Sequence, residues 1–290
     1  MMGGFAKSTA KIACTSMMAA AAASLFASAA SAGPQITFAP HRAVYDLSLD
    51  DAKSGSGVIG VSGRIVYELT GSACEGYAQS MRFVTITTNQ DGEQQTTDLR
   101  TSSWEEVPAR RLRFSTTTYQ NETLAQQTQG IAEREAGTGS GSAVVEIKRP
   151  HKQKSKLAGD IYFPIQHSMA IVAAAQDGKT ILTADLFDGS ESGNKVYATS
   201  TAIGRAFKPG GGPTITLSSG STALAKVRSW PISVSYFKPG ASRADALPLY
   251  EMSYRFHDNG VTSSLRIDHG DFAIKGELKQ LSYLDAGKCK

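Results

Sequence analysis

The sequence predicts an all-β fold of antiparallel strands with one short α-helix, and three observations support this. Apolar and polar residues alternate with a period of two along most of the chain, which is typical of strands with one face toward a core and the other toward water. Turn-forming residue pairs that end in glycine separate many of these runs. One segment follows a helical period instead.

The strand pattern is clearest near the start of the folded region. Tyr45, Leu47 and Leu49 alternate with Asp46 and Ser48. Residues 59–70 continue the pattern in a long amphipathic strand, whose glycines favour curvature or a bulge. Alternation then recurs in residues 81–88, 95–107, 111–120, 143–148, 180–187, 195–207, 224–237, 249–257, 261–268 and 271–284.

The last of these runs changes parity. Its apolar positions move from Phe272, Ile274 and Leu278 to Leu281 and Tyr283. Successive side chains of a strand point to opposite faces, so one extra residue is needed to keep both sets on the core side. We therefore expect a β-bulge near Lys279.

The turn signals predict how the strands connect. They are Asp91-Gly92, Asp188-Gly189, Pro239-Gly240, Asn259-Gly260 and His269-Gly270. Hairpin turns need a positive φ, which glycine accepts, so we expect successive strands to be antiparallel neighbours. Asn259-Gly260 is the strongest signal and predicts a two-residue hairpin turn.

The helical segment runs from Pro164 to Asp177. It places Ile165, Met169, Val172 and Ala173 on one face. Pro164 suits the first turn of a helix, and Gly178 suits the position after its last turn. The sequence therefore predicts one short helix that packs by this face against the sheet.

The N-terminus predicts export. Residues 1–32 contain two lysines and no acidic residue, then an apolar run over residues 12–27 and the sequence Ala30-Ser31-Ala32 before Gly33. This order is typical of a cleavable signal peptide, and an uncleaved anchor is the alternative. We expect cleavage between Ala32 and Gly33, a single domain over residues 33–290 and a periplasmic location.

The charge balance argues against a dedicated nucleic-acid binder. Lys and Arg total 30 against 26 Asp and Glu, a net charge of +4. Removal of Lys7 and Lys11 with the signal peptide leaves 28 against 26, or +2. A binder of nucleic acid normally carries a much larger basic excess.

Two cysteines, Cys74 and Cys289, remain after removal of the signal peptide. Export makes a disulfide between them the default expectation. It would close a very long loop, for which the loop-entropy model gives roughly 5 kcal/mol as an upper estimate. The alternatives are two free thiols or a pair of metal ligands, although Cys74 has no CxxC motif or histidine nearby.

No motif predicts a catalytic residue, a metal site or a cofactor. Gly55, Gly57 and Gly60 match GxGxxG, but a strand follows them instead of the helix that a dinucleotide requires. The five histidines form no HxH or HExxH motif. His167 and Ser168 are adjacent on the predicted helix and so point about 100° apart. We interpret the acidic pairs Glu105-Glu106 and Asp268 with Asp271 as solvated strand ends.

The largest concentration of charge is a basic stretch. It comprises Lys148, Arg149, His151, Lys152, Lys154 and Lys156. It is a candidate contact with a partner or with anionic lipid, where each lysine near a membrane contributes about 1 kcal/mol. A charged, exposed hairpin that protects a sheet edge from pairing is the interpretation that we favour.

Several motifs, in order along the chain, resemble a known family. They are residues 40–47 (PHRAVYDL), 163–167 (FPIQH), 186–190 (LFDGS), 248–251 (PLYE), 259–261 (NGV) and 268–272 (DHGDF). Together with the two cysteines they resemble the EipB-type periplasmic cell-envelope integrity proteins of Gram-negative bacteria. His269 departs from the pattern, where tyrosine is expected.

The resemblance implies a fold and a role. The fold would be a long antiparallel sheet that curls into an open β-spiral or broken barrel without closing, with one short helix and a disulfide that joins the N-terminal region to the C-terminal end. The role would be non-enzymatic maintenance of the envelope, mattering most under stress.

Three functional hypotheses follow. The first is a periplasmic protein whose curled sheet binds another envelope component, such as a periplasmic or outer-membrane protein. The second is a carrier or chaperone for lipid or lipoprotein acyl chains. The third, a hydrolase, requires His167, Ser168 and a carboxylate to converge in space.

Overall fold

The computed structural model describes residues 36–107, 109–134, 141–215, 217, 221–238, 240 and 245–287. The chain divides after Gln35, and all described residues belong to the unit Ile36–Lys290. The expected signal peptide, its cleavage site between Ala32 and Gly33, and Cys289 lie outside the described residues.

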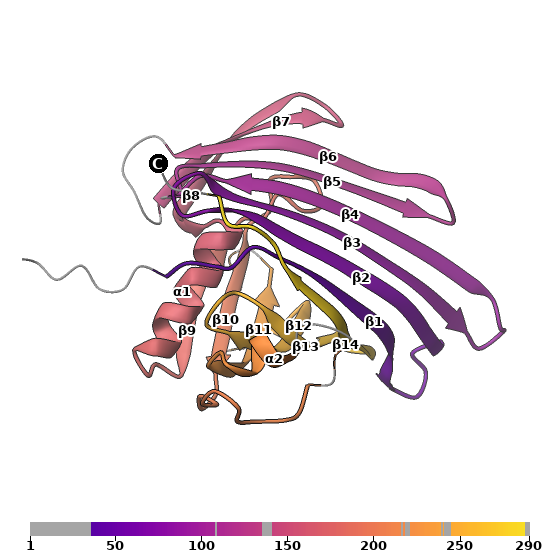
Figure 1. The fold of residues 1–290 in the computed structure, drawn as a ribbon. Helices are drawn as coiled ribbons and strands as arrows, with labels where there is room; N and C mark the ends of the chain where they lie inside the picture. The colour runs from indigo at the N-terminus through magenta and orange to yellow at the C-terminus, as the bar shows by residue number, and fades with distance from the viewer. Residues whose placement is uncertain are drawn as a thin grey trace, which may run out of the picture. The chain divides into compact units, whose positions relative to one another are not determined.

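Strands dominate the described chain, which confirms the predicted all-β class (Figure 1). The strands are β1 (His41–Ala52), β2 (Val58–Ser72), β3 (Gly76–Asn89), β4 (Gln94–Glu105), β5 (Arg111–Gln120), β6 (Thr123–Arg134), β7 (Gly141–Arg149), β8 (Gln153–Tyr162), β9 (Ile181–Leu186), β10 (Tyr197–Ile203), β11 (Ser229–Phe237), β12 (Tyr250–His257), β13 (Thr262–Asp268) and β14 (Phe272–Tyr283). The helices are α1 (Pro164–Gln176) and α2 (Ser221–Ala225).

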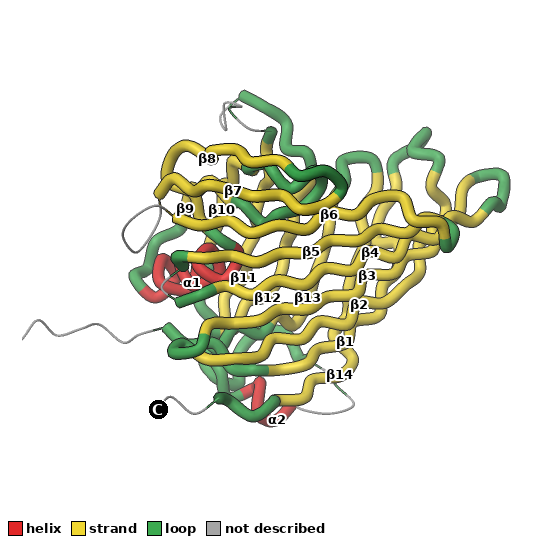
Figure 2. The backbone as a smooth tube through the Cα atoms, turned by 90° about the horizontal axis from the view of Figure 1, so that it is seen from above, coloured by secondary structure: helices red, strands yellow, loops and turns green. Residues whose placement is uncertain are grey.

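The sheet closes on itself, whereas the family resemblance implied that it stays open. Each strand pairs with its neighbours in sequence, and β1 also pairs with β14, so that a ring forms (Figure 2). The weakest seam is between β8 and β9, which are parallel and joined by two residue pairs, Ile161 with Asp185 and Tyr162 with Leu186. Parallel neighbours need a crossover connection, and α1 provides it. All other strand pairs are antiparallel, as predicted.

The predicted bulge lies at Lys279. Val44 of β1 pairs with Gln280 and Tyr45 pairs with Leu278, so Lys279 has no partner position on β1. The extra residue allows both Leu278 and Leu281 to reach the buried face, where they are 4% and 1% exposed.

The hairpin between β12 and β13 forms, but its turn is longer than predicted. The His257 N–H donates to the Val261 carbonyl at 2.8 Å, which leaves three residues in the loop. The additional residue is Asp258, whose N–H donates to the Arg228 carbonyl and whose carboxylate pairs with the Arg228 guanidinium at 3.0 Å. Gly260 still has a positive φ, as the sequence predicts.

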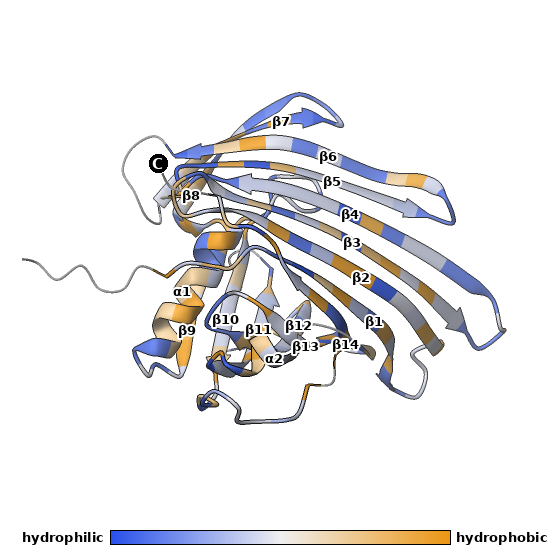
Figure 3. Ribbon diagram, viewed as in Figure 1, coloured by the Kyte–Doolittle hydropathy of each residue, from blue (hydrophilic) through white to orange (hydrophobic). Residues whose placement is uncertain are grey.

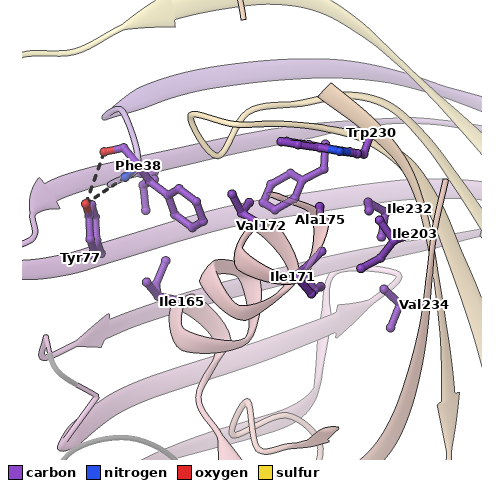
Figure 4. Packing of buried hydrophobic residues seen from close by; sticks show 13 residues of the cluster. Phe38, Tyr77, Ile165, Ile171, Val172, Ala175, Ile203, Trp230, Ile232 and Val234 are labelled. Carbon is purple, nitrogen blue, oxygen red and sulfur yellow. Dashed lines mark hydrogen bonds between the residues drawn. The ribbon is translucent and has the colours of Figure 1, made fainter. Parts of the chain in front are cut away.

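Helix α1 lies inside the ring instead of on one face of the sheet. Its Ile165, Ile171 and Val172 pack in one buried cluster with residues of β2, β3, β10, β11 and β12 (Figure 4). Because strands surround the helix, it is buried on more than the one predicted face: Ile165 and Val172 are buried as expected, and Ala174 and Ala175 are buried as well. The predicted Met169 and Ala173 are only partly buried.

Hydropathy follows this arrangement. Apolar residues gather on α1 and alternate with polar residues along the long strands β1 to β3 (Figure 3). Helix α2 was not predicted, because the sequence pattern assigned residues 224–237 to a strand. The structure shortens that strand to β11 and uses Leu224, in α2, to fill a buried cluster with Val261 and Leu281.

Candidate functional site

A cavity of about 320 Å³ lies at the centre of the ring. It is lined by side chains from β1, β2, β3, α1, β9, β11, β12 and β13 and from the loops between them. Its apolar wall includes Phe38, Ile65, Met81, Met252 and Leu265. The remainder of the lining is polar, so the cavity can contact both an apolar group and hydrogen-bonding groups.

Tyrosine hydroxyls form part of the polar lining. The Tyr45 hydroxyl donates to the Thr262 carbonyl at 2.6 Å, which ties β1 to the start of β13. The Gln79 amide donates to the Tyr67 hydroxyl at 2.8 Å and links β2 to β3. Burial raises the pKa of Tyr67 to about 12, and it also raises the pKa of Tyr45. These phenols therefore stay neutral.

Two histidines of the cavity are buried and neutral. His167 of α1 is 4% exposed, and its Nε2 lies 3.4 Å from the Thr199 hydroxyl. Burial lowers the pKa of His167 to about 4. His41 is 1% exposed, its Nδ1 lies 2.7 Å from the Ala39 carbonyl oxygen, and burial lowers its pKa too. Neither ring carries a positive charge near neutral pH.

Asp188, two residues after the end of β9, contributes a carboxyl group to the lining of this cavity. Its Oδ1 accepts the N–H of Ser190 at 2.9 Å. Burial raises the pKa of Asp188, and the nearby Glu191 adds to this effect. The cavity therefore holds an acid that resists ionisation beside neutral histidines and phenols.

His167, Ser168 and Asp188 line the same cavity, as the hydrolase hypothesis requires. Their contacts do not form a catalytic relay, however. The Ser168 hydroxyl donates to the Pro164 carbonyl one turn earlier, at 2.9 Å, and the His167 ring contacts Thr199. Activation of a serine needs a hydrogen bond from its hydroxyl to a base. Here the Ser168 hydroxyl is bound to a backbone carbonyl and the His167 ring contacts Thr199, so His167 does not activate Ser168.

Glu105 is a buried anchor of α1, so the interpretation as a solvated strand end was wrong for this residue. It is 2% exposed and accepts the backbone N–H groups of Ile165 at 2.7 Å and Gln166 at 2.9 Å. These N–H groups belong to the first turn of α1, where a helix has unsatisfied donors and a positive dipole end. Sequence reasoning missed it because the partner lies 60 residues away.

Arg134 of β6 completes the anchor. It is 6% exposed, and its guanidinium donates to the carbonyls of Ala109 at 2.8 Å and Ile161 at 2.7 Å and to the Gln166 side chain at 2.9 Å. It also stacks over the Phe163 ring at 4.3 Å. The network fixes the start of α1 to β4, β6 and β8.

The basic stretch forms the hairpin of β7 and β8, which we call the basic hairpin. Lys148, Arg149, Lys152, Lys154 and Lys156 are all exposed. Lys154 pairs with Glu146 at 2.9 Å, and Arg149 donates to the Gln127 side chain at 3.1 Å. Because β8 contacts β9 only through its last two residues, most of β8 is an edge that lysines keep from pairing.

Cys74 lies in the exposed turn between β2 and β3. Its expected partner, Cys289, is outside the described residues, so the disulfide stays a prediction. Gly287 is close to this turn, because a Cβ atom at Gly287 would collide with the carboxylate of Glu75.

The described residues contain no group of three or more His, Cys, Asp or Glu side chains placed to hold a metal ion. Within the same part of the chain, no helix has the length and apolar character needed to cross a membrane.

Comparison with known proteins gives consistent results. The family model for EipB-like proteins matches residues 32–285. The chain is 35% identical over 265 residues to the cell envelope integrity protein EipB of Brucella abortus (strain 2308), covering 91% of each chain. It also resembles a crystal structure from Brucella abortus, described as a β-barrel-like protein of a domain of unknown function. The TM-score is 0.78 at 32% identity, covering 87% of this chain and 100% of that chain.

Proposed function

This chain belongs to the EipB-like family, and from this premise we propose that it maintains cell-envelope integrity as a non-enzymatic periplasmic protein that binds another envelope component through its curled sheet. The observation that carries the proposal is 35% identity, over 91% of both chains, to a protein named for envelope integrity. The blocked Ser168 hydroxyl also favours binding over catalysis.

The periplasmic location rests on the N-terminal pattern. Residues 1–32 have the charge, the apolar run and the small residues of a signal peptide. An oxidising compartment would allow Cys74 and Cys289 to form the expected disulfide. The proximity of Gly287 to Glu75 supports this pairing, because each residue is within two positions of one of the cysteines.

The basic hairpin is a candidate contact surface. Its cations are exposed and extend along the end of β7 and along β8, whose edge opposite β7 pairs with β9 only at Ile161 and Tyr162. An acidic protein of the periplasm or outer membrane, or an anionic lipid headgroup, would complement this charge.

A carrier of lipid or lipoprotein acyl chains is the second candidate, and the central cavity is the observation that favours it. Its volume of about 320 Å³ lies at the lower end of the range of ligand pockets, and Phe38, Met81 and Met252 give it an apolar wall. A copurified lipid of defined mass in native mass spectrometry would support the carrier, and a protein-only species would contradict it.

A deletion strain tests the main proposal. We expect loss of the protein to increase sensitivity to detergents and to agents that challenge the outer membrane. Expression of the full chain should restore resistance, whereas a chain that lacks residues 1–32 should not, because it would stay in the cytoplasm. Unchanged sensitivity of the deletion strain would contradict the proposal.

A further inference from the structure

A groove of about 670 Å³ crosses the outer face of strands β2 to β7. The strand register shows how it is built: Ser80 pairs with Ser102, and Ser102 pairs with Ser115. Alternate residues such as Tyr77, Leu112 and Phe114 are buried inside the ring. The three serines therefore point outward and form a floor of small hydroxyl side chains.

One wall combines aromatic, apolar and cationic side chains. Trp104 of β4 pairs with Arg113 of β5, and the guanidinium lies 5.3 Å from the ring centroid. Arg113 in turn pairs with Ile131 of β6. This wall offers an apolar surface next to a positive charge.

A second row of outward side chains lies on the other side of the serine floor. It includes Arg82 of β3, two residues after Ser80, and Arg100 of β4, two residues before Ser102. Both guanidiniums bind the carboxylate of Asp98, at 2.8 Å and 2.7 Å. Hydrogen bonds from Arg100 and then from Arg82 lower the pKa of Asp98 to about 2, so it stays ionised. One carboxylate is shared by two guanidiniums, which leaves an excess of positive charge.

The two ends of the groove differ. Glu68 lines one end and pairs with Arg42 at 3.6 Å. Lys148 lines the other end, where Gln129 pairs with Arg149 and Gly130 pairs with Ile147, so that Lys148 is the extra residue of a bulge. A bulge of this kind re-aims the side chain, here toward the groove.

Positive charge therefore dominates the groove and its rim. The cationic residues are Arg42, Arg82, Arg100, Arg111, Arg113, Lys148, Arg149 and Lys154, and the acidic residues are Glu68, Asp98, Glu133 and Glu146. With strands about 4.8 Å apart, the six strands extend the groove over roughly 24 Å, and its flanking rows of side chains are about 13 Å apart. These dimensions fit an extended, narrow and negatively charged chain.

A second groove, on the outer face of β10 to β14, has a volume of about 1020 Å³ and also has more cations than acids in its lining: Arg255, Arg266, Lys275 and Lys279 against Asp50 and Glu277. Its Arg266 pairs with Asp50 and Asp268, and its Lys275 pairs with Glu277. Arg255 donates to the carbonyls of Gly211 and Pro213, and Lys279 shares Glu277 with Lys275. The cations of the second groove are therefore held by acceptors of the chain itself.

We propose that the groove over β2 to β7 binds an anionic glycan strand that lies across the β-strands. The inference rests on the proposed function and names the envelope component. Serine hydroxyls and the Gln129 amide can hydrogen-bond sugar hydroxyls, Trp104 and Ile131 can contact the apolar face of a ring, and arginines bind carboxylate or phosphate groups. An added peptide strand does not fit, because β3 to β6 are paired on both sides.

Isothermal titration of the purified protein with oligogalacturonates, using dextran oligomers as neutral probes, tests the inference. We expect binding of the anionic probe only, weakened by salt. Arg113→Gln combined with Lys148→Gln should weaken binding at least about tenfold, equivalent to about 1.4 kcal/mol. Ser102→Tyr should do the same, because it fills the floor without changing the charge.

The matched control is Lys208→Gln combined with Lys226→Gln, which removes the same charge from two exposed residues outside both the groove and the basic hairpin. We expect its affinity to stay within about twofold of the wild type. Equal loss in this control, or full binding by the Ser102→Tyr variant, would overturn the proposed site. Binding to phosphatidylglycerol vesicles in place of the glycan would assign the surface to a membrane and would also overturn it.

The proposed function and the glycan site can fail separately. If the groove variants lose glycan binding and also fail to restore detergent resistance in the deletion strain, both proposals are supported. If the wild type restores resistance but binds no oligogalacturonate, the glycan inference fails and the envelope role stands.

Discussion

Replacing Glu105 with glutamine tests whether a buried carboxyl group controls the docking of α1. The carboxylate accepts the N–H groups of Ile165 at 2.7 Å and Gln166 at 2.9 Å. Burial raises its pKa from 4.5 to about 7, against the opposite effects of these two hydrogen bonds and of Arg134. The group therefore titrates at a higher pH in the folded protein than in the unfolded chain.

The sign of the effect follows from linkage. Below pH 4.5 the carboxyl group is protonated in both states; as the pH rises toward 7 it ionises first in the unfolded chain, which favours unfolding. The shift from 4.5 to about 7 corresponds to a fall of up to about 3 kcal/mol in the free energy of unfolding. The glutamine variant cannot ionise and lacks this fall, although loss of an acceptor costs it about 1 kcal/mol at low pH.

Urea unfolding, followed by the fluorescence of Trp104 and Trp230 at pH values from about 5 to about 8, measures both proteins. We expect the wild type to be about as stable as the Glu105→Gln variant near pH 5 and roughly 2 kcal/mol less stable than it at pH 8, because the fall of about 3 kcal/mol exceeds the cost of about 1 kcal/mol. Other titrating groups are shared by the two proteins and cancel in the difference. Glu122→Gln, in an exposed turn, is the control and should follow the wild type. A constant difference between wild type and Glu105→Gln across this range would refute the reasoning.

Three further predictions concern stability. Burial lowers the pKa of His167 from 6.5 to about 4, so the free energy of unfolding of the wild type should fall by up to about 3 kcal/mol as the pH drops through this interval. The His167→Asn variant should lack this fall in acid unfolding. The same pH dependence in both proteins would contradict the prediction. Ile171→Ala should lower the free energy of unfolding by about 2–5 kcal/mol in urea titrations, while Ile181→Ala, at a residue that is 65% exposed, should change it by less than about 0.5 kcal/mol; similar losses would argue against the buried helix. Cys74→Ser and Cys289→Ser should each lower stability, by up to roughly 5 kcal/mol, and protease resistance under oxidising conditions; a wild type that melts equally with and without reductant would refute the disulfide.

The sequence predicted the elements that are determined by residues close together in the chain. Strand β5 lies where the alternation of residues 111–120 placed it, and α1 starts at Pro164 as predicted. Strands β6 and β8 were not predicted, because their inward positions are not consistently apolar. In β6, Thr128 and Gly130 face inward beside Phe114, and in β8 Ala158, Gly159 and Asp160 separate the buried Leu157 and Ile161.

The site was less predictable, because it depends on contacts between distant segments. The charges of the basic hairpin could be recognised, since they are consecutive in sequence. The role of Glu105 could not, because its acceptor function arises only when α1 lies inside the ring. The groove floor likewise needs the registers of β3, β4 and β5, in which a shift of one residue would turn Ser102 inward.

The anchor of α1 also separates a carrier from a surface-binding protein. The central cavity borders α1 through Ile165, His167 and Ser168, so an acyl chain that enters from this side must displace a helix held by Glu105 and Arg134. Glu105→Ala would weaken that hold and should accelerate exchange of a bound fatty acid if the protein is a carrier. It should leave glycan affinity unchanged if the groove is the functional surface, because Glu105 faces the interior of the ring while Trp104, next to it, faces the groove. The fatty-acid exchange rate and the glycan affinity of this one variant therefore assign the function either to the interior or to the outer face of the same sheet.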